Sequence, residues 1–390
     1  MRDAARYAAA IGIVDAWLDG APVEQALTRW ARGARYAGSK DRAAVRDIVY
    51  GVLRRKTSCA ALGGGETGRA LILGWLRSAA RDTDAVFTGE GHAPPPLTAD
   101  ERTTGAQPSL PHPDVPQWML AELEPTLVSD GTLDHLQDRA PLWLRVNRRK
   151  TTPREAAEAL AADGVTATPH PDLPTALRVD DGERRLRNGR AYQDGLVEIQ
   201  DLSPHWAVAR LDLSQTGTVL DFCAGGGGKA LALADRSDAR ILAHDALPRR
   251  MADLPARAAR AGVRIDTLAP EALATSGPFD LVLTDVPCSG SGTWRRDPEA
   301  KWRLTRDALA DLLRVQAEIL DQAADLVAPG GQLVYMTCSL FRAENDAQIE
   351  AFLTRRPGWQ CSARRLDTPI TASDGFFSAI LRRQEDSPQA

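Results

Sequence analysis

The stretch that decides the fold is residues 219–229, which read Val-Leu-Asp-Phe-Cys-Ala-Gly-Gly-Gly-Gly-Lys. Its first residues form a short apolar run typical of a buried strand, and the glycines predict a tight turn that opens a helix. Glycines let the backbone approach a ligand closely, and a helix N-terminus favours negative or polar ligand atoms. Asp245 ends the next apolar run, where a carboxylate can accept hydrogen bonds from ribose hydroxyls. The pattern indicates a nucleoside-containing cofactor, and NAD and S-adenosylmethionine fit it alike.

Strand and helix patterns alternate from this stretch to the end of the chain. Short apolar runs predict strands at 218–222, 240–244, 281–284, 333–336 and 376–381. Helical periodicity falls between them, at 229–236, 251–261, 309–327 and 343–355. This alternation predicts an α/β fold with a doubly wound, mostly parallel sheet.

The part before this sheet has a different composition. Residues 1–80 show apolar residues at helical spacing and predict an all-α domain. Seven prolines between residues 89 and 116 indicate a linker or loop, so 81–138 is expected to be a Pro-rich linker with a short helix. Residues 139–210 predict a small α+β module, and 211–390 the catalytic domain.

Composition excludes several classes of protein. The 390 residues carry a net charge of −4, which excludes a uniformly basic nucleic-acid coat. The sequence contains no run of 18 apolar residues, so we expect no membrane span, and the first residues do not resemble a signal peptide. The five cysteines are widely spaced, which favours free thiols in a reducing compartment and no metal site. We therefore expect a cytoplasmic protein that is not bound to a membrane.

Two cysteines follow two successive predicted strands. Cys288 lies in Asp-Val-Pro-Cys-Ser-Gly, which begins at Asp285, and Cys338 lies in Thr-Cys-Ser, which begins at Thr337. The carboxyl ends of parallel strands form the edge where ligands bind in such sheets. A lone cysteine is usually a small core residue, but two at paired strand ends favour nucleophilic chemistry.

These motifs together resemble the RsmB/Nop2/Sun family of RNA cytosine-C5 methyltransferases. Leu-Arg-Val-Asn at 144–147 and Ile-Gln-Asp at 199–201 resemble its RNA-binding module, and the segments at 295–303, 343–345 and 374–377 match further landmarks. The segments at 38–42 and 49–55 resemble the NusB-like helical domain of its bacterial ribosomal branch. The resemblance implies a class I S-adenosylmethionine-dependent, Rossmann-like methyltransferase preceded by an α+β RNA-binding module and a NusB-like domain.

The resemblance also implies roles for individual residues. Cys338 would add to C6 of cytosine, Cys288 would help to resolve the adduct, and Asp285 would stabilise charge at N3 of the ring. S-adenosylmethionine would be bound by Cys223, Ala224, Gly225, Gly226, Gly227, Gly228, Lys229, Asp245, Arg250 and Asp285. RNA contacts are expected from Arg145, Asn147, Arg295, Arg296 and Lys301, because arginine and lysine clusters bind phosphates.

The NusB-like beginning favours 16S rRNA as the substrate, acted on by a monomer. One alternative is a tRNA cytosine-C5 methyltransferase, and another is a catalytically silent RNA-binding factor of ribosome assembly. Methylation of exocyclic amines would require an Asn/Asp-Pro-Pro-aromatic motif, whose place Cys288 occupies. A DNA cytosine-C5 enzyme would use the Pro-Cys cysteine as its nucleophile and would not need Cys338.

Overall fold

The computed structural model describes residues 1–384 and consists of two compact units. The first contains Met1–Ala121, Pro125–Asp138 and Trp294–Arg303, and the second contains Glu122–Glu124, Arg139–Thr293 and Leu304–Ala390, of which the structure describes residues up to 384. The predicted α+β module and the predicted sheet thus lie within one unit. Each unit is described separately below.

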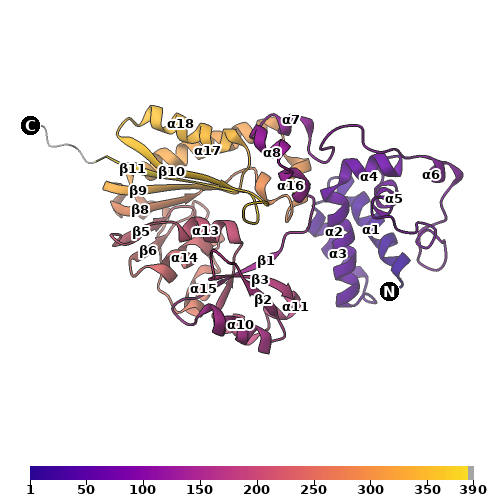
Figure 1. Cartoon of the computed structure of the whole chain (residues 1–390), viewed down its shortest axis with the longest axis horizontal. Helices are drawn as coiled ribbons and strands as arrows, with labels where there is room; N and C mark the ends of the chain where they lie inside the picture. Colours follow the sequence, from indigo (N-terminus) through magenta and orange to yellow (C-terminus); the bar gives the residue numbers. More distant parts are fainter. Residues whose placement is uncertain (385–390) are drawn as a thin grey trace, which may run out of the picture. The chain divides into compact units, whose positions relative to one another are not determined.

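The second unit is built on a seven-stranded sheet with the strand order β10-β11-β9-β8-β5-β6-β7 (Figure 1). Its strands are β5 (Thr218–Asp221), β6 (Arg240–Ala243), β7 (Asp266–Thr267), β8 (Phe279–Asp285), β9 (Val327–Thr337), β10 (Trp359–Asp367) and β11 (Phe376–Arg383). The strands from β7 to β9 pair in parallel, whereas β11 is antiparallel to both β9 and β10. The sheet is therefore mostly parallel, as predicted.

Helices cover both faces of this sheet. They are α13 (Leu202–Ala209), α14 (Gly228–Arg236), α15 (Leu254–Ala261), α17 (Arg306–Asp325) and α18 (Asp346–Arg355). Because successive strand residues point to opposite faces, Val282 of β8 packs with α17 and α18, and Leu281 and Leu283 pack with α13 and α14. Apolar residues on both sides of the central strands explain why they read as continuous hydrophobic runs.

The α+β module is a four-stranded antiparallel sheet of order β2-β3-β1-β4 with helices beside it. Its elements are β1 (Leu142–Val146), α10 (Pro153–Ala162), β2 (Thr166–Pro169), β3 (Ala176–Asp181), α11 (Glu183–Leu186), α12 (Arg190–Gln193) and β4 (Val197–Ile199). Thr152 caps α10, since its hydroxyl accepts a hydrogen bond from the N–H of Glu155 and the Glu155 carboxylate accepts one in return. The Asn147 amide donates to the carbonyl oxygen of Ala261, at 2.8 Å, which ties the module to α15.

The first unit is helical. Its elements are α1 (Asp3–Leu18), α2 (Val23–Gly33), α3 (Ser39–Arg54), α4 (Lys56–Gly63), α5 (Gly68–Ser78), α6 (Ala99–Thr103), α7 (Gln117–Leu120), α8 (Pro125–Ser129), α9 (Thr132–His135) and α16 (Pro298–Arg303). The all-α N-terminal region is therefore confirmed. The prolines at 89–116 predict no regular helix there, with the short helix of the linker expected at about 117–137, whereas a capping box of Thr98 and Glu101 supports the short helix α6 within this segment.

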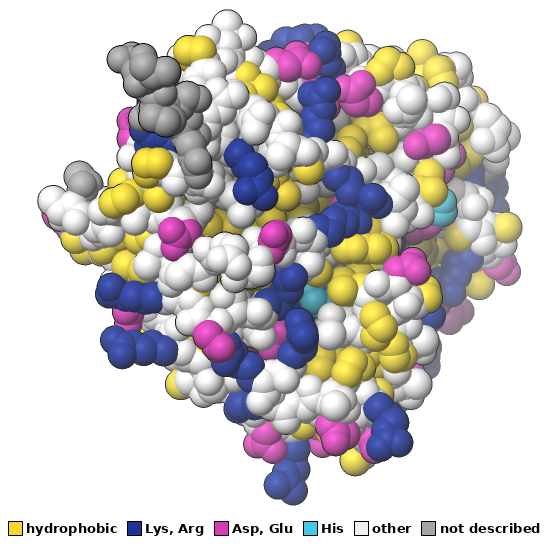
Figure 2. Space-filling model, turned by 60° about the vertical axis from the view of Figure 1, so that its left-hand side comes forward, with side chains coloured by type: hydrophobic (Ala, Val, Ile, Leu, Met, Phe, Trp, Pro, Cys, Tyr) yellow, Lys and Arg dark blue, Asp and Glu magenta, His cyan; other side chains and the backbone are white. Residues whose placement is uncertain are grey.

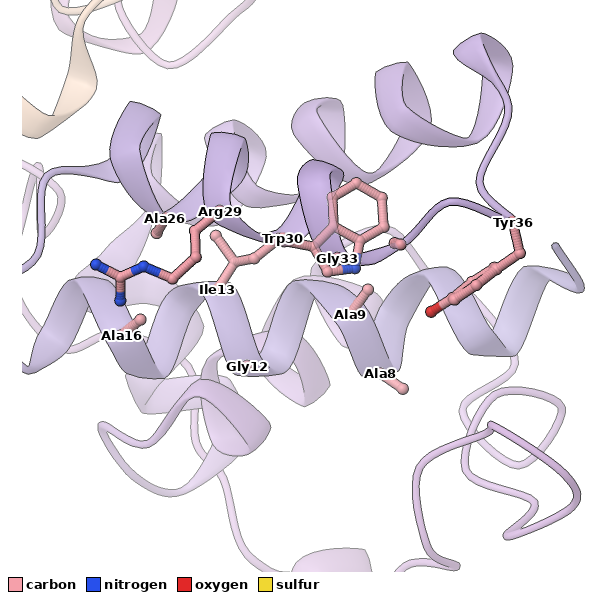
Figure 3. Close-up of a pocket in the computed structure, with 11 residues that line it drawn as sticks. Ala8, Ala9, Gly12, Ile13, Ala16, Ala26, Arg29, Trp30, Gly33 and Tyr36 are labelled. Carbon is pink, nitrogen blue, oxygen red and sulfur yellow. The ribbon is translucent and has the colours of Figure 1, made fainter.

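A shallow groove runs along the first two helices of this unit. Figure 3 shows small α1 residues, among them Gly12 and Ala16, facing the side chains of Arg29 and Trp30 from α2. The small α1 side chains leave room for the Trp30 indole, which is half-buried against the core of the unit. The groove thus follows from the small residues of α1.

Residues 294–303 leave the sheet between β8 and β9 and complete the helical unit. The indole N–H of Trp302 donates to the carbonyl oxygen of Leu53 at 2.7 Å, and the N–H of Val23 donates to the Glu299 carboxylate at 3.2 Å. These contacts fix α16 against α3 and the start of α2.

No helix within the described residues combines the length and the apolar character needed to cross a membrane.

Candidate active site

The glycine-rich turn leads from β5 into α14 as the sequence predicts. Gly225 and Gly227 have φ values of +50° and +79°, a region that favours glycine. A Cβ at Gly227 would lie 2.2 Å from a methyl carbon of Leu254, so a side chain there would also clash. The turn therefore depends on glycine at this position, and it leaves backbone N–H groups of α14 at the carboxyl edge of the sheet.

Asp245 follows β6 and is fixed beside this turn. Its carboxylate accepts hydrogen bonds from the N–H of Gly225 at 3.0 Å and the N–H of Leu247 at 2.9 Å, and Arg250 forms an ion pair with it at 3.2 Å. A carboxylate offers about four acceptor positions, so one remains for a hydroxyl group. The Arg250 side chain is 53% exposed and has room to move when a ligand enters.

Predicted cofactor residues from 223 to 229, together with Asp245 and Arg250, thus lie at the ends of β5 and β6. A buried, oriented carboxylate next to a glycine turn fits the ribose of a nucleoside cofactor. Burial raises the pKa of the Cys223 thiol. Because only the thiolate is nucleophilic, Cys223 is suited to lining this site and not to attacking a substrate. Asp266 lies on the edge strand β7, where its carboxylate forms ion pairs with Arg240 and Arg264.

Lys229, in the first turn of α14, forms an ion pair with Asp285 at the end of β8, with 2.5 Å between Nζ and Oδ2. Burial lowers the pKa of Lys229, but attraction to Asp285, the hydrogen bond to it and the charges of Asp221 and Cys338 together raise that pKa above its usual value. Lys229 therefore stays protonated. Its ammonium group also interacts electrostatically with Cys338.

Cys288 and Cys338 lie side by side, with 3.3 Å between their Sγ atoms. Cys288 comes from the loop after β8, and Cys338 directly follows β9, its parallel neighbour. Hydrogen bonding to Cys338, burial, and the negative charges of Cys338 and Glu344 raise the pKa of Cys288 well above that of a free thiol. Cys288 therefore holds its proton at neutral pH.

The backbone around the two thiols is packed closely. Gly292 donates its N–H to the carbonyl oxygen of Cys338 at 2.9 Å, and Gly375 donates to the carbonyl oxygen of Gly292 at the same distance. A Cβ on Gly292 would lie 2.1 Å from the Gly375 oxygen, so only glycine allows this approach. This packing brings the segment before β11 next to the loop that carries Cys288.

Two buried carboxyl groups were not among the predicted site residues: Glu344 lies near Cys288, and Asp221 lies near Lys229 and Asp285. Asp221 ends β5, and Glu344 lies in the turn of residues Arg342–Glu344 before α18. Both residues are fully or almost fully buried. The strand-end position of Asp221 was the available signal, since acidic residues at such positions face the ligand edge. Glu344 lies in the segment 343–345, which resembles the family, but no chemical signal in the sequence marks it as a site residue.

The predicted RNA contacts have a different environment. The side chains of Arg145, Asn147, Arg295 and Lys301 are buried, which is at odds with direct contact to phosphates. Arg145 hydrogen bonds to Gln200 at 2.8 Å and ion pairs with Asp235 at 3.4 Å. Burial lowers the pKa of Lys301 to about 7.

Lys301 donates to the carbonyl oxygen of Arg54 at 3.0 Å and lies over the Trp302 ring. Arg145 and Lys301 therefore stabilise the units in which they are buried. Of the five residues, Arg296 is exposed. Figure 2 shows that on one face of the molecule lysine and arginine side chains are interspersed with acidic ones.

No cluster of histidine, cysteine and acidic side chains suited to a metal ion occurs among the residues that the structure describes.

Comparison with known proteins agrees with this arrangement. The family model described as 16S rRNA methyltransferase RsmB/F matches residues 208–383, and an RsmF/B-like ferredoxin-like domain matches residues 115–184. "Ribosomal RNA small subunit methyltransferase B" of Cronobacter sakazakii is 33% identical over 283 residues, and that of Salmonella arizonae 35% over 284 residues. Both alignments cover 68% of this chain and 66% of the relative. The matched part thus spans slightly less than two thirds of these relatives.

Solved structures show the same fold. The crystal structure of PH0851 aligns with a TM-score of 0.76 at 22% identity, over 98% of this chain and 99% of that one. NSun6 from Pyrococcus horikoshii, solved with SFG, aligns with a TM-score of 0.59 at 17% identity, over 72% of this chain and 99% of that one. The predicted methyltransferase fold is thereby confirmed. The match to a methyltransferase family confirms S-adenosylmethionine over NAD. The chain belongs to the RsmB/F family of methyltransferases, as its resemblance to the RsmB/Nop2/Sun proteins implied.

Proposed function

We propose that the protein methylates C5 of a cytosine in 16S rRNA and that Cys338 is its nucleophile. The observation that carries this proposal is the pair of thiols 3.3 Å apart at the ends of β8 and β9. Exocyclic amine or protein methylation needs no such pair, whereas C5 of cytosine must first be activated by a nucleophile at C6. The names of the relatives support a small-subunit ribosomal RNA substrate.

The reaction follows from the residues around the thiols. The Cys338 thiolate forms a bond to C6, and the electron pair of the C5–C6 double bond makes C5 nucleophilic. Asp285 is held by Lys229 at the end of β8, and we assign its carboxyl group to balancing charge at N3 of the ring. S-adenosylmethionine, when bound by the glycine turn and Asp245, supplies the methyl group.

Resolution of the adduct requires loss of the C5 proton. The C5 proton passes to solvent, the C5–H electron pair restores the C5–C6 double bond, and the bond from C6 to Cys338 breaks with release of the thiolate. We assign assistance in this step to Cys288, whose sulfur is adjacent to that of Cys338. The cytosine must be unstacked to reach the thiols, which favours a loop or a single-stranded stretch of RNA. Such an enzyme would act in the cytoplasm as a monomer.

Separate replacement of the two cysteines tests the chemistry. We expect Cys338→Ala to abolish methyl transfer, and Cys288→Ala to accumulate a covalent protein–RNA adduct that survives denaturing electrophoresis. Cys361→Ala is the matched control, because this thiol lies on β10 and is expected to leave both readouts unchanged. If Cys288→Ala prevents the adduct and Cys338→Ala does not, the assigned roles are wrong.

Bisulfite sequencing of RNA from cells with and without the gene tests the substrate. Loss of one protected cytosine in 16S rRNA is the expected result. A protected cytosine lost from tRNA instead would replace the substrate but keep the reaction. Unchanged cytosines in both RNAs would favour a silent factor of ribosome assembly.

A further inference from the structure

Glu344 is a buried carboxylate that receives four hydrogen bonds. Oε1 accepts from the backbone N–H of Ser289 at 2.8 Å and from the side-chain amide of Gln316 at 2.9 Å. Oε2 accepts from the hydroxyl groups of Ser289 and Ser339. The side chain is fully buried, so water does not compete for these bonds. Four donors around one carboxylate form a specific, charge-assisted network.

The donors come from the two loops that carry the reactive thiols. Ser289 directly follows Cys288, and Ser339 directly follows Cys338. The hydroxyl of Ser291 adds a second link between these loops, since its oxygen lies 3.0 Å from that of Ser339. Glu344 therefore connects the two loops through its two carboxylate oxygens, one residue away from each sulfur.

Glu344 is itself fixed on a rigid support. Its backbone carbonyl accepts a hydrogen bond from the Tyr335 hydroxyl at 2.7 Å, and Gln316 reaches it from α17. The next residue, Asn345, accepts from the Thr337 hydroxyl at 2.6 Å and donates to the carbonyl oxygen of Ser339 at 2.9 Å. The Cys338 loop is thus held on both sides of the cysteine, and Glu344 adds the connection across to Cys288.

We propose that Glu344 is a positioning residue that holds Cys288 and Cys338 in contact. The link to catalysis rests on the proposed function, because that function gives both sulfurs a part in one reaction. Two sulfurs held side by side require their loops to keep a fixed spacing, and the only residue of the described chain whose carboxylate accepts from Ser289 and Ser339 together is Glu344. A shift of about 1 Å between reacting groups can lower a rate about 100-fold.

Two substitutions of Glu344 separate the effect of side-chain length from the effect of its charge. Glu344→Gln keeps the length and can accept from the Ser289 N–H and Gln316 while its amide donates to the two hydroxyls. Glu344→Asp keeps the charge but is one methylene too short to reach both loops. Asp367→Asn is the control, because it neutralises another buried carboxylate of the same unit. Asp367 lies at the end of β10 and accepts hydrogen bonds from Arg210 and Arg365.

Disulfide formation measures the sulfur spacing without any methyl transfer. The diazene oxidant diamide takes two electrons and two protons from the thiols of Cys288 and Cys338, forms the S–S bond and is reduced to its hydrazine. Peptide mapping by mass spectrometry follows this bond in the full-length protein. We expect Glu344→Asp to slow its formation about 10- to 100-fold and Glu344→Gln and Asp367→Asn to stay within about threefold of wild type.

Activity is measured alongside. The kcat for 16S rRNA should fall with the same ranking, while the Kd for S-adenosylmethionine, bound at the ends of β5 and β6, should not change. Wild-type disulfide rates in Glu344→Asp would overturn the proposal, as would a faster rate in Glu344→Asp than in Glu344→Gln. If the rates rank as expected but wild-type protein makes no 5-methylcytosine, the positioning role stands and the proposed function fails.

Discussion

Asp221 at the end of β5 predicts an unusual pH dependence of stability. The side chain is 1% exposed, and no donor in the described structure meets hydrogen-bond geometry at either carboxyl oxygen. Burial raises its pKa to about 7, against attraction to Lys229 and a weak contact with the N–H of Ala230, and the charges of Asp285 and Asp245 raise it further. Replacement by asparagine keeps the shape of the side chain and removes the ionisation.

The size of the effect follows from the two states of the chain. The unfolded chain has the ordinary pKa of 3.8, so it releases the proton of Asp221 at a lower pH than the folded protein does. Ionisation between about pH 4 and pH 7 therefore favours the unfolded state and lowers wild-type stability. A difference of about three in pKa corresponds to about 4 kcal/mol when ionisation is complete. The asparagine variant does not experience this loss.

Urea unfolding of both proteins from pH 4 to pH 8 measures the difference. The gain in unfolding free energy from Asp221→Asn should be near zero at pH 4 and about 4 kcal/mol at pH 8. Asp280→Asn is a control of opposite sign. Burial opposes its ionisation, but hydrogen bonds from the N–H and hydroxyl of Thr218 and the N–H of Gly217 lower the pKa of Asp280 overall. That variant should lose stability at neutral pH and recover it in acid. A gain from Asp221→Asn that does not vary with pH would refute the reasoning.

Three further predictions concern the thiols, the cofactor and the core. Alkylation of Cys288 by iodoacetamide should require a pH well above that of a free cysteine, because its pKa is raised; half-maximal rates near pH 8.5 or below would contradict this. Asp245→Ala should weaken S-adenosylmethionine binding about 10-fold or more by calorimetry, since two loop N–H groups lose their acceptor; an unchanged Kd would remove Asp245 from the site. Arg145→Met should cost about 3–5 kcal/mol of unfolding free energy by leaving Asp235 buried without its partner, against under about 0.5 kcal/mol for the exposed Arg154→Ala; equal losses would exclude a buried ion pair.

The sheet and the glycine turn could be predicted because their signal is local. Each of the five predicted strands overlaps an observed one, since β5, β6, β8, β9 and β11 are buried and therefore apolar in sequence. The edge strand β10 could not be recognised in this way. It contains Arg364 and Arg365, most of its residues are not buried, and its conformation depends on pairing with β11.

Burial of charged residues could not be predicted because their partners are distant in sequence. Arg145 belongs to a run that looks like a solvated basic face, yet its partner Asp235 is ninety residues away along the chain. Lys301 likewise binds the backbone of Arg54, which nothing near residue 301 reveals. The role of Glu344 has the same origin, since the loops that it joins follow different strands.

The excursion of residues 294–303 out of the sheet has a consequence for how the chain folds. The ribosome releases helices α1 to α5 first, so the surface that receives Trp302 and Glu299 exists before β9 is made. The connection between β8 and β9 then docks onto helices that have already formed. Docking lowers the conformational entropy that this connection must lose when β8 and β9 pair. A chain shortened to begin after residue 138 would contain this connection without its partner and would leave Trp302 exposed to water. If such a fragment aggregated, the cause would be the apolar surface left uncovered by the missing helices, and the sheet itself could still be intact.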